Sequence, residues 1–207
     1  KKFGLRTAKI VIVCGITTAR RLNLQLKTAF MDKSELRKIM RRRNRELPPE
    51  ARAEASSRIF GEVERLPAFA GARVVGLFCS LPDEPDTRQA LARWCAGGRR
   101  VVVPCVEGDE MDFYDCDGRE LVPGAFGIVE PPRTHRCDPA EIDLLVVPGV
   151  AFAPSGSRLG RGRGYYDRYL AQPGFRAATV GVCYRHQLVD DLPAEPHDRP
   201  VGCVVAG

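Results

Sequence analysis

The chain has 207 residues, 44% of them hydrophobic and 28% charged, and its 32 Lys and Arg against 26 Asp and Glu give a net charge of +6. This composition excludes a disordered chain, a collagen-like repeat and a small disulfide scaffold. No apolar run approaches the ~20 residues that a membrane-spanning helix needs. The length fits one or two domains with a buried core.

The positive charge is concentrated at the start of the chain. Residues 1–30 contain seven basic residues and no acidic one, which leaves 25 basic against 26 acidic residues from Met31 onward. We expect Met31 to be the natural start, with residues 1–30 forming a basic leader outside the fold and residues 31–207 forming one domain. The alternative is a transit peptide, because the leader contains Arg and lacks acids.

Two helices are predicted first. Residues 32–46 form a strongly basic helix, with Asp32 as its N-cap and Glu35 as the reciprocal partner of a capping box, and Pro48-Pro49 ends it. A second helix is predicted over residues 49–66, because its small and apolar side chains recur on one face.

Strands and helices then alternate. The pattern predicts strands at 73–79, 100–106, 143–147, 178–183 and 201–205, a hairpin or excursion over 111–129, and helices at 87–96 and 165–171. The core strands are apolar throughout, which is typical of strands covered on both faces. The sequence therefore predicts a single three-layer α/β/α domain with a mostly parallel sheet, whose ligands bind beyond the carboxyl ends of the strands.

The eight cysteines contain no C-x-x-C pair and no zinc-ligand spacing. Cys79, Cys105, Cys183 and Cys203 lie in strand-like runs, where thiols behave as small buried hydrophobes. We expect a reduced, intracellular protein.

A glycine- and arginine-rich loop follows the strand at 143–147 and opens a helix. Gly160, Gly162 and Gly164 alternate with Leu159, Arg161 and Arg163. Glycines allow close backbone approach, and their N–H groups beside a helix N-terminus offer an anion site. The G-K-[ST] ending of a P-loop is absent. A phosphate-bearing ligand is expected here, and a solvated flexible loop is the alternative.

Five segments in order resemble one family. RLGRGRGYYDRYL after VPGVAF, together with KSELRK, CSLPDEPDT, FGIVEP and HDRPV, is similar to the 5-formyltetrahydrofolate cyclo-ligase family over residues 31–207 and not over 1–30. The resemblance implies a sheet like that of phosphosugar isomerases and CoA-transferases.

The resemblance also implies the site. Its ATP-binding positions are Lys33, Ser34, Glu35, Leu36, Arg37, Arg158, Leu159, Gly160, Arg161, Gly162, Arg163, Gly164, Tyr165 and Tyr166. Its folate-binding positions are Cys79 and Glu84, and its Mg²⁺ contacts are Asp167 and Asp198. Lys33, Glu84 and Arg161 are expected to be catalytic. Phe113, Tyr114 and Phe126 are candidate pterin walls, and Gly127–Pro131 is expected to frame the folate pocket. The three histidines receive no role.

The implied reaction converts 5-formyltetrahydrofolate and ATP to 5,10-methenyltetrahydrofolate, ADP and phosphate through an N5-iminium phosphate. It belongs to one-carbon metabolism, needs Mg²⁺, and is expected of a cytoplasmic monomer without nucleic-acid or membrane partners. Two rivals stay open. A phosphosugar isomerase or CoA-transferase on a similar sheet would not consume ATP, and a nucleic-acid-binding protein would use the basic leader and first helix.

Overall fold

The computed structural model describes residues 10–13, 31–118, 122–123 and 129–207. Its helices are α1 (Lys33–Glu46), α2 (Pro49–Glu64), α3 (Pro67–Gly71), α4 (Arg88–Ala96) and α5 (Tyr165–Leu170), with short 3-10 turns at Pro139–Glu141 and Arg185–Gln187. The expected Phe126, Gly127 and Ile128 lie outside the described residues.

A seven-stranded sheet forms the centre of the molecule. In spatial order its strands are β1 (Ile10–Val13), β11 (Cys203–Ala206), β10 (Ala178–Cys183), β7 (Leu144–Pro148), β2 (Val74–Gly76), β3 (Arg100–Glu107) and β4 (Glu110–Asp115). Every pairing is parallel except the β3–β4 hairpin. Two small ladders lie outside this sheet, β5 (Val122–Pro123) with β6 (Val129–Glu130) and β8 (Ala151–Phe152) with β9 (Arg158–Leu159). The predicted α/β domain with a mostly parallel sheet is confirmed.

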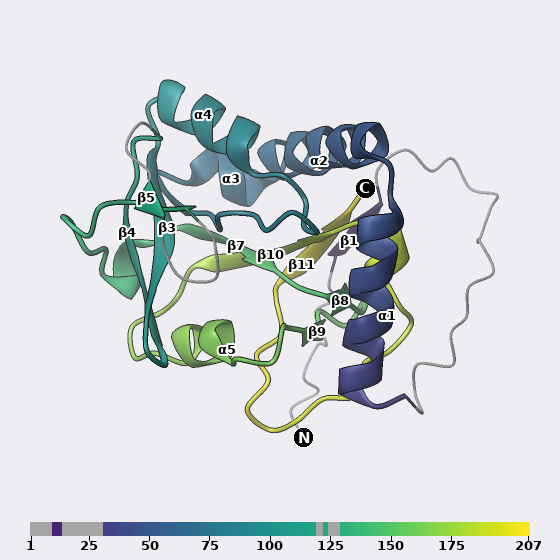
Figure 1. The fold of residues 1–207 in the computed structure, drawn as a ribbon. Helices are drawn as coiled ribbons and strands as arrows, with labels where there is room; N and C mark the ends of the chain where they lie inside the picture. Colours follow the sequence, from purple (N-terminus) through teal and green to yellow (C-terminus); the bar gives the residue numbers. More distant parts are fainter. Residues whose placement is uncertain (1–9, 14–30, 119–121, 124–128) are drawn as a thin grey trace, which may run out of the picture.

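Helices cover both faces of the sheet, as the uniformly apolar strands predict. Figure 1 shows α2, α3 and α4 on one face and α5 on the other. Neighbouring strand residues point to opposite faces: Val101 and Val103 pack in the cluster below α2 and α4, whereas Val102 packs with Tyr169 of α5. Cys105 and Cys183 are buried, whereas Cys203 is only partly so. None of the helices in the described ranges is long and apolar enough to cross a membrane.

Helix α1 lies at the end of the sheet where the parallel strands finish (Figure 1). Its Leu36 and Met40 are fully buried against Val150, Ala151 and the other apolar residues that follow β7. The expected capping box is wrong: Asp32 precedes the helix without a side-chain cap, and its carboxylate accepts the Ser34 hydroxyl at 2.7 Å. The apolar side of α1 thus fixes the helix against the segment that follows β7.

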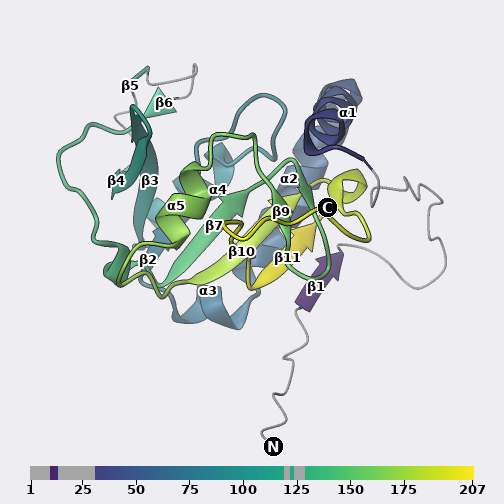
Figure 2. The same ribbon diagram turned by 90° about the horizontal axis from the view of Figure 1, so that it is seen from below.

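One expectation about the leader needs correction. Residues 10–13 form β1, which pairs in parallel with β11 at the edge of the sheet and is seen at the rim of Figure 2. The expectation that residues 1–30 lie outside the fold is therefore wrong for Ile10–Val13. This run of four β-branched residues suits an extended strand, which its basic surroundings obscured in the sequence. The remaining leader residues lie outside the described part of the chain.

Candidate active site

A cavity of about 1420 Å³ opens at the carboxyl ends of β2, β3 and β7. Its walls come from segments far apart in sequence: the start of α1, residues 78–84 after β2, the glycine–arginine loop before α5, and residues 193–199. Among the expected site residues, Lys33, Ser34, Arg37, Cys79, Glu84, Asp198 and every residue from Arg158 to Asp167 line it. Glu35 and Leu36 do not, because Glu35 is exposed to solvent and Leu36 is fully buried in the core below α1.

The glycine–arginine loop follows a path that needs glycine at two points. Gly162 and Gly164 have φ of 100° and 70°, in the left-handed region that side chains with a Cβ disfavour. Arg37 on α1 fixes the loop from outside, since its Nε donates to the Gly160 carbonyl at 2.8 Å. The loop is therefore held against α1.

The arginines of this loop hold acidic partners. Arg158 donates from Nη2 to Asp167 Oδ1 at 2.7 Å, and the Arg158 side chain is only 4% exposed. Arg161 donates from Nε to Glu84 Oε1 at 2.8 Å and from Nη2 to Asp83 Oδ1 at 2.6 Å. The loop is thereby connected both to α5 and to the segment that carries Glu84.

Lys33 forms a second charged group in the cavity. Its Nζ lies 2.8 Å from Asp198 Oδ2 and 3.1 Å from Glu195 Oε1. Burial opposes the charged form of Lys33, but hydrogen bonds to these two carboxylates raise its pKa overall. Burial likewise acts against the charged Asp198, yet the Lys33 ammonium and the Glu195 backbone hold the Asp198 pKa below its usual value. Both groups are thus kept charged at neutral pH.

A hydrogen bond from the backbone next to Asp198 brings the segments of Asp167 and Asp198 together. The Arg199 N–H, next to Asp198, donates to Asp167 Oδ1 at 3.1 Å. Mg²⁺ binds through one or two carboxylates, with phosphate oxygens and water completing its shell. Two carboxylates beside the glycine–arginine loop fit that donor set.

Glu84 is the buried acid of the site. Its side chain is 8% exposed, its Oε2 accepts the Leu81 N–H at 3.0 Å, and burial raises its pKa against the opposing effect of Arg161. Buried carboxylates are rare unless paired, and Arg161 supplies that partner at Oε1, which leaves lone pairs of Glu84 for a polar group of a ligand in the cavity that it lines. Cys79 is nearly buried beside it.

The apolar walls of the cavity differ from those expected. Phe113 is fully buried in the core, against Tyr169, and neither it nor Tyr114 lines the cavity. The apolar lining comes instead from Phe78, Pro104, Val106, Met111, Tyr165 and Tyr166. The Tyr166 hydroxyl is buried with no hydrogen-bond partner in the described part of the chain, which makes it a candidate contact for a bound molecule.

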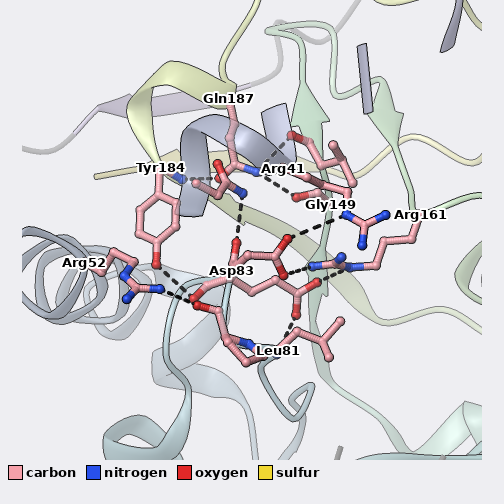
Figure 3. A network of polar contacts seen from close by, with 12 residues as sticks. Arg41, Arg52, Leu81, Asp83, Gly149, Arg161, Tyr184 and Gln187 are labelled. Atoms are coloured by element: carbon pink, nitrogen blue, oxygen red, sulfur yellow. Dashed lines mark hydrogen bonds and ion pairs between the residues drawn. The ribbon is translucent and has the colours of Figure 1, made fainter. Parts of the chain in front are cut away.

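Several supporting residues were missed by the sequence analysis. Asn44 is 2% exposed and donates to the Asp83 carbonyl at 2.8 Å, while its Oδ1 lies 2.6 Å from His186 Nε2. Gln187 donates to the Gly149 and Val150 carbonyls at the base of the cavity. No local pattern signals these contacts, because each joins segments far apart in sequence. Figure 3 shows Gln187 beside Gly149 and Tyr184, and the polar contacts around Asp83 and Arg161.

The fold and the cavity together define an α/β enzyme with a glycine- and arginine-rich loop at the carboxyl edge of a mostly parallel sheet. Residues 29–207 match the model of the 5-formyltetrahydrofolate cyclo-ligase family, and the chain belongs to this family. It is therefore an enzyme of the ligase class, as the sequence resemblance implied.

Individual relatives agree with this assignment. The 5-formyltetrahydrofolate cyclo-ligase of Escherichia coli is 32% identical over 81% of this chain and 96% of the relative, and that of Mycolicibacterium smegmatis is 31% identical over 80% and 89%. Among solved structures, the 5,10-methenyltetrahydrofolate synthetase of Aquifex aeolicus has a TM-score of 0.77 and 36% identity, covering 85% of this chain and 90% of that one.

Proposed function

We propose that this enzyme converts 5-formyltetrahydrofolate and ATP to 5,10-methenyltetrahydrofolate, ADP and phosphate. The observation that carries the proposal is that one cavity contains both a buried carboxylate, Glu84, and the glycine–arginine loop, joined by the 2.8 Å contact of Arg161. A reaction between a nucleotide and a folate needs both substrates in one enclosure. The family membership of residues 29–207 supports the same reaction.

The chemistry explains why ATP is consumed. The oxygen of the formyl group that N5 carries is a poor leaving group, so it must be activated before the ring can close. Transfer of the γ-phosphoryl to this oxygen gives an N5-iminium phosphate and ADP. N10 then attacks the iminium carbon, N10 loses its proton, and the carbon–oxygen bond breaks to release phosphate. The protein contributes mainly positioning and charge stabilisation to such a transfer.

The nucleotide is assigned to the wall that carries the basic groups. Lys33 and the loop arginines would stabilise the triphosphate, and Ser34 and Arg37 lie on the same wall. Because Glu35 and Leu36 point away from the cavity, we assign them no contact beyond the helix backbone. Asp167 and Asp198 would hold Mg²⁺, which supplies charge neutralisation for the phosphates.

The folate is assigned to the other wall. A pteridine carries N–H donors on one edge, and the Glu84 carboxylate is a suitable acceptor for them. The apolar faces of the ring would rest among Phe78, Met111 and the tyrosines of α5, with Cys79 beside the ring through its backbone. Glu84 would orient the ring so that the formyl oxygen faces the loop.

A direct assay tests the proposal. Purified protein mixed with Mg-ATP and 5-formyltetrahydrofolate should show growing absorbance in the methenyl product's band, with one phosphate released per product. Omitting either substrate should abolish both signals. Product formation without ATP, or phosphate release that does not require the folate, would contradict the proposal and favour an isomerase or transferase reaction on the same sheet.

A further inference from the structure

The segment Leu81–Glu84 is held in place by side chains from other parts of the fold. Three consecutive carbonyls, those of residues 82, 83 and 84, each accept a hydrogen bond from a different element. The donors are Arg52 of α2 at 2.6 Å, Asn44 of α1 at 2.8 Å and the Tyr184 hydroxyl after β10 at 2.9 Å. Arg52, Asp83 and Tyr184 are seen together in Figure 3. Such preorganisation fixes the position of the Glu84 carboxylate before any ligand arrives.

Asp83 adds a second carboxylate to this fixed segment. Its side chain is 12% exposed, its Oδ1 accepts Arg161 Nη2 at 2.6 Å, and its Oδ2 lies 3.8 Å from Arg41 Nε. Arg161 Nε donates at the same time to Glu84. One guanidinium is therefore shared by two adjacent carboxylates, as Figure 3 shows on the Asp83 side.

The sharing matters because it limits how far Arg161 can neutralise Glu84. A carboxylate in a one-to-one bidentate pair with arginine has its charge compensated and its acceptor lone pairs occupied. Here Arg161 presents only Nε to Glu84, and its terminal nitrogen is turned to Asp83. Glu84 therefore keeps acceptor capacity beyond its single contact with Arg161 and the Leu81 N–H.

We propose that Asp83 is a positioning residue for the folate substrate: it holds the Arg161 guanidinium away from full pairing with Glu84, so that Glu84 stays free to accept the pteridine N–H donors. This inference rests on the proposed function. It adds a residue that touches neither the folate nor the nucleotide and acts through Arg161.

The charges around Glu84 give the proposed role of Asp83 a measurable effect on the Glu84 pKa. Facing it are Arg161 from the loop, Asp83 from its own segment, Tyr166 from α5 and Tyr184 after β10. Burial raises the Glu84 pKa most strongly, Arg161 opposes this, and the neighbouring Asp83 charge adds to the increase. Removing the Asp83 charge should thus lower the Glu84 pKa while strengthening its pairing with Arg161.

The test compares Asp83→Asn with Asp86→Asn. Asn keeps the size of the side chain and the backbone carbonyl that Asn44 binds. Asp86 lies in the same loop but outside the cavity, paired with Arg88 at 2.6 Å. For Asp83→Asn at pH 8, we expect the KM for 5-formyltetrahydrofolate to rise about tenfold, the loss of roughly one charged hydrogen bond. We expect kcat and the KM for ATP to change less than about twofold. Asp86→Asn should leave all three unchanged.

A pH profile separates this role from simple structural support. In Asp83→Asn the acid limb of kcat/KM for the folate should move to lower pH by about half a unit, whereas Asp83→Glu, which keeps the charge, should leave it in place. If the wild type is active but Asp83→Asn has the same kcat and KM values as Asp86→Asn, the role of Asp83 is overturned and the proposed function stands. Equal increases in both KM values with an unmoved limb would also overturn it. Inactive wild-type protein would overturn the proposed function as well.

Discussion

The two walls of the cavity are built differently. The wall that we assign to the nucleotide carries cation–carboxylate pairs, Lys33 with Asp198 at 2.8 Å and Arg158 with Asp167 at 2.7 Å. The wall that we assign to the folate carries Glu84, whose segment is fixed by backbone contacts and which shares one arginine with Asp83. One wall places separate pairs of opposite charges beside each other, whereas the other wall holds the buried Glu84 carboxylate in a fixed place beside an arginine that it shares with Asp83.

This difference follows from what each substrate presents. A nucleotide with its metal ion brings both signs of charge, so each member of an ion pair on that wall can find a new counter-charge when it binds. A pteridine brings a pattern of N–H donors without a full charge, so its wall needs an acceptor whose position is set in advance. We expect substitutions on the nucleotide wall to act on the chemical step, and substitutions on the folate wall to act on binding.

Asp167→Asn should have the largest effect. The change keeps the size of the side chain but removes the carboxylate that pairs with Arg158 and is expected to hold Mg²⁺. Turnover at saturating substrates should fall about a hundredfold or more, as when one electrostatic contact to a reacting group is lost. Steady-state product absorbance at several Mg²⁺ concentrations measures it. Asp190→Asn, an exposed change outside the cavity, is the control. Unchanged turnover at saturating Mg²⁺ would contradict the assignment of Asp167.

Glu84→Ala should affect the folate and spare the nucleotide. Losing a buried charged acceptor costs about 1.5–3 kcal/mol per hydrogen bond, which corresponds to a ten- to hundredfold weaker affinity for 5-formyltetrahydrofolate. Calorimetric titration with each substrate separately measures the two affinities. Retained folate binding with lost nucleotide binding would remove Glu84 from the folate wall and reverse the assignment of the two walls.

Asn44→Ala should test whether the fixed segment matters without touching its carboxylates. The change removes the donor to the Asp83 carbonyl and the partner of His186. The free energy of unfolding should fall by about 1–3 kcal/mol, because buried polar groups lose their partners. The KM for the folate should rise severalfold. Denaturant unfolding and steady-state kinetics measure the two effects, and Arg45→Ala on the exposed side of α1 is the control. A stability loss without any change in KM would show that the segment needs no such support.

The sequence predicted the sheet more accurately than the strand ends. The apolar run at 73–79 was expected to be one strand, yet β2 stops at Gly76. Leu77 still donates its N–H to the Val102 carbonyl of β3 at 2.9 Å, and Phe78 stays buried beyond that last contact, so the apolar run extends past the end of the strand. An apolar pattern reports burial, and the point at which a strand turns away to form a site depends on its neighbours.

The site was predictable to the same limited extent. The resemblance to a family identified Lys33 and Glu84, because their local motifs are distinctive. It did not identify Asp83, which in sequence is one more acid in a loop; its partner Arg161 lies 78 positions away. Asn44 stands among arginines on a basic helix, and only the fold brings it, buried, beside the Asp83 carbonyl and His186. A contact between two segments far apart in the chain leaves no recognisable pattern in the sequence of either segment.

The smallest expected effect concerns the pH dependence of the fixed segment. Burial lowers the pKa of His186 from 6.5 to about 4, and the nearby Arg43 adds to this. Since Asn44 donates to the Asp83 carbonyl through Nδ2, its Oδ1 must accept, so the neutral His186 donates from Nε2. The unfolded chain binds a proton near pH 6.5 and the folded chain only near pH 4, so the stability contributed by neutral His186 is complete above pH 6.5 and decreases as the pH falls toward 4.

His186→Gln should remove this dependence, because Gln can donate to Asn44 without titrating. Between pH 7 and pH 4 the wild type should lose more stability than the variant, by on the order of 1 kcal/mol after allowing for the partial exposure of the ring. Urea unfolding at four or five pH values in this range measures the difference, and all other titrating groups cancel between the two proteins. Parallel curves would mean that His186 takes up its proton as readily in the folded protein as in the unfolded chain. The contact between His186 and Asn44 would then be as accessible to solvent as the ion pairs of the nucleotide wall. The segment that carries Glu84 would no longer differ from that wall in being held by buried contacts.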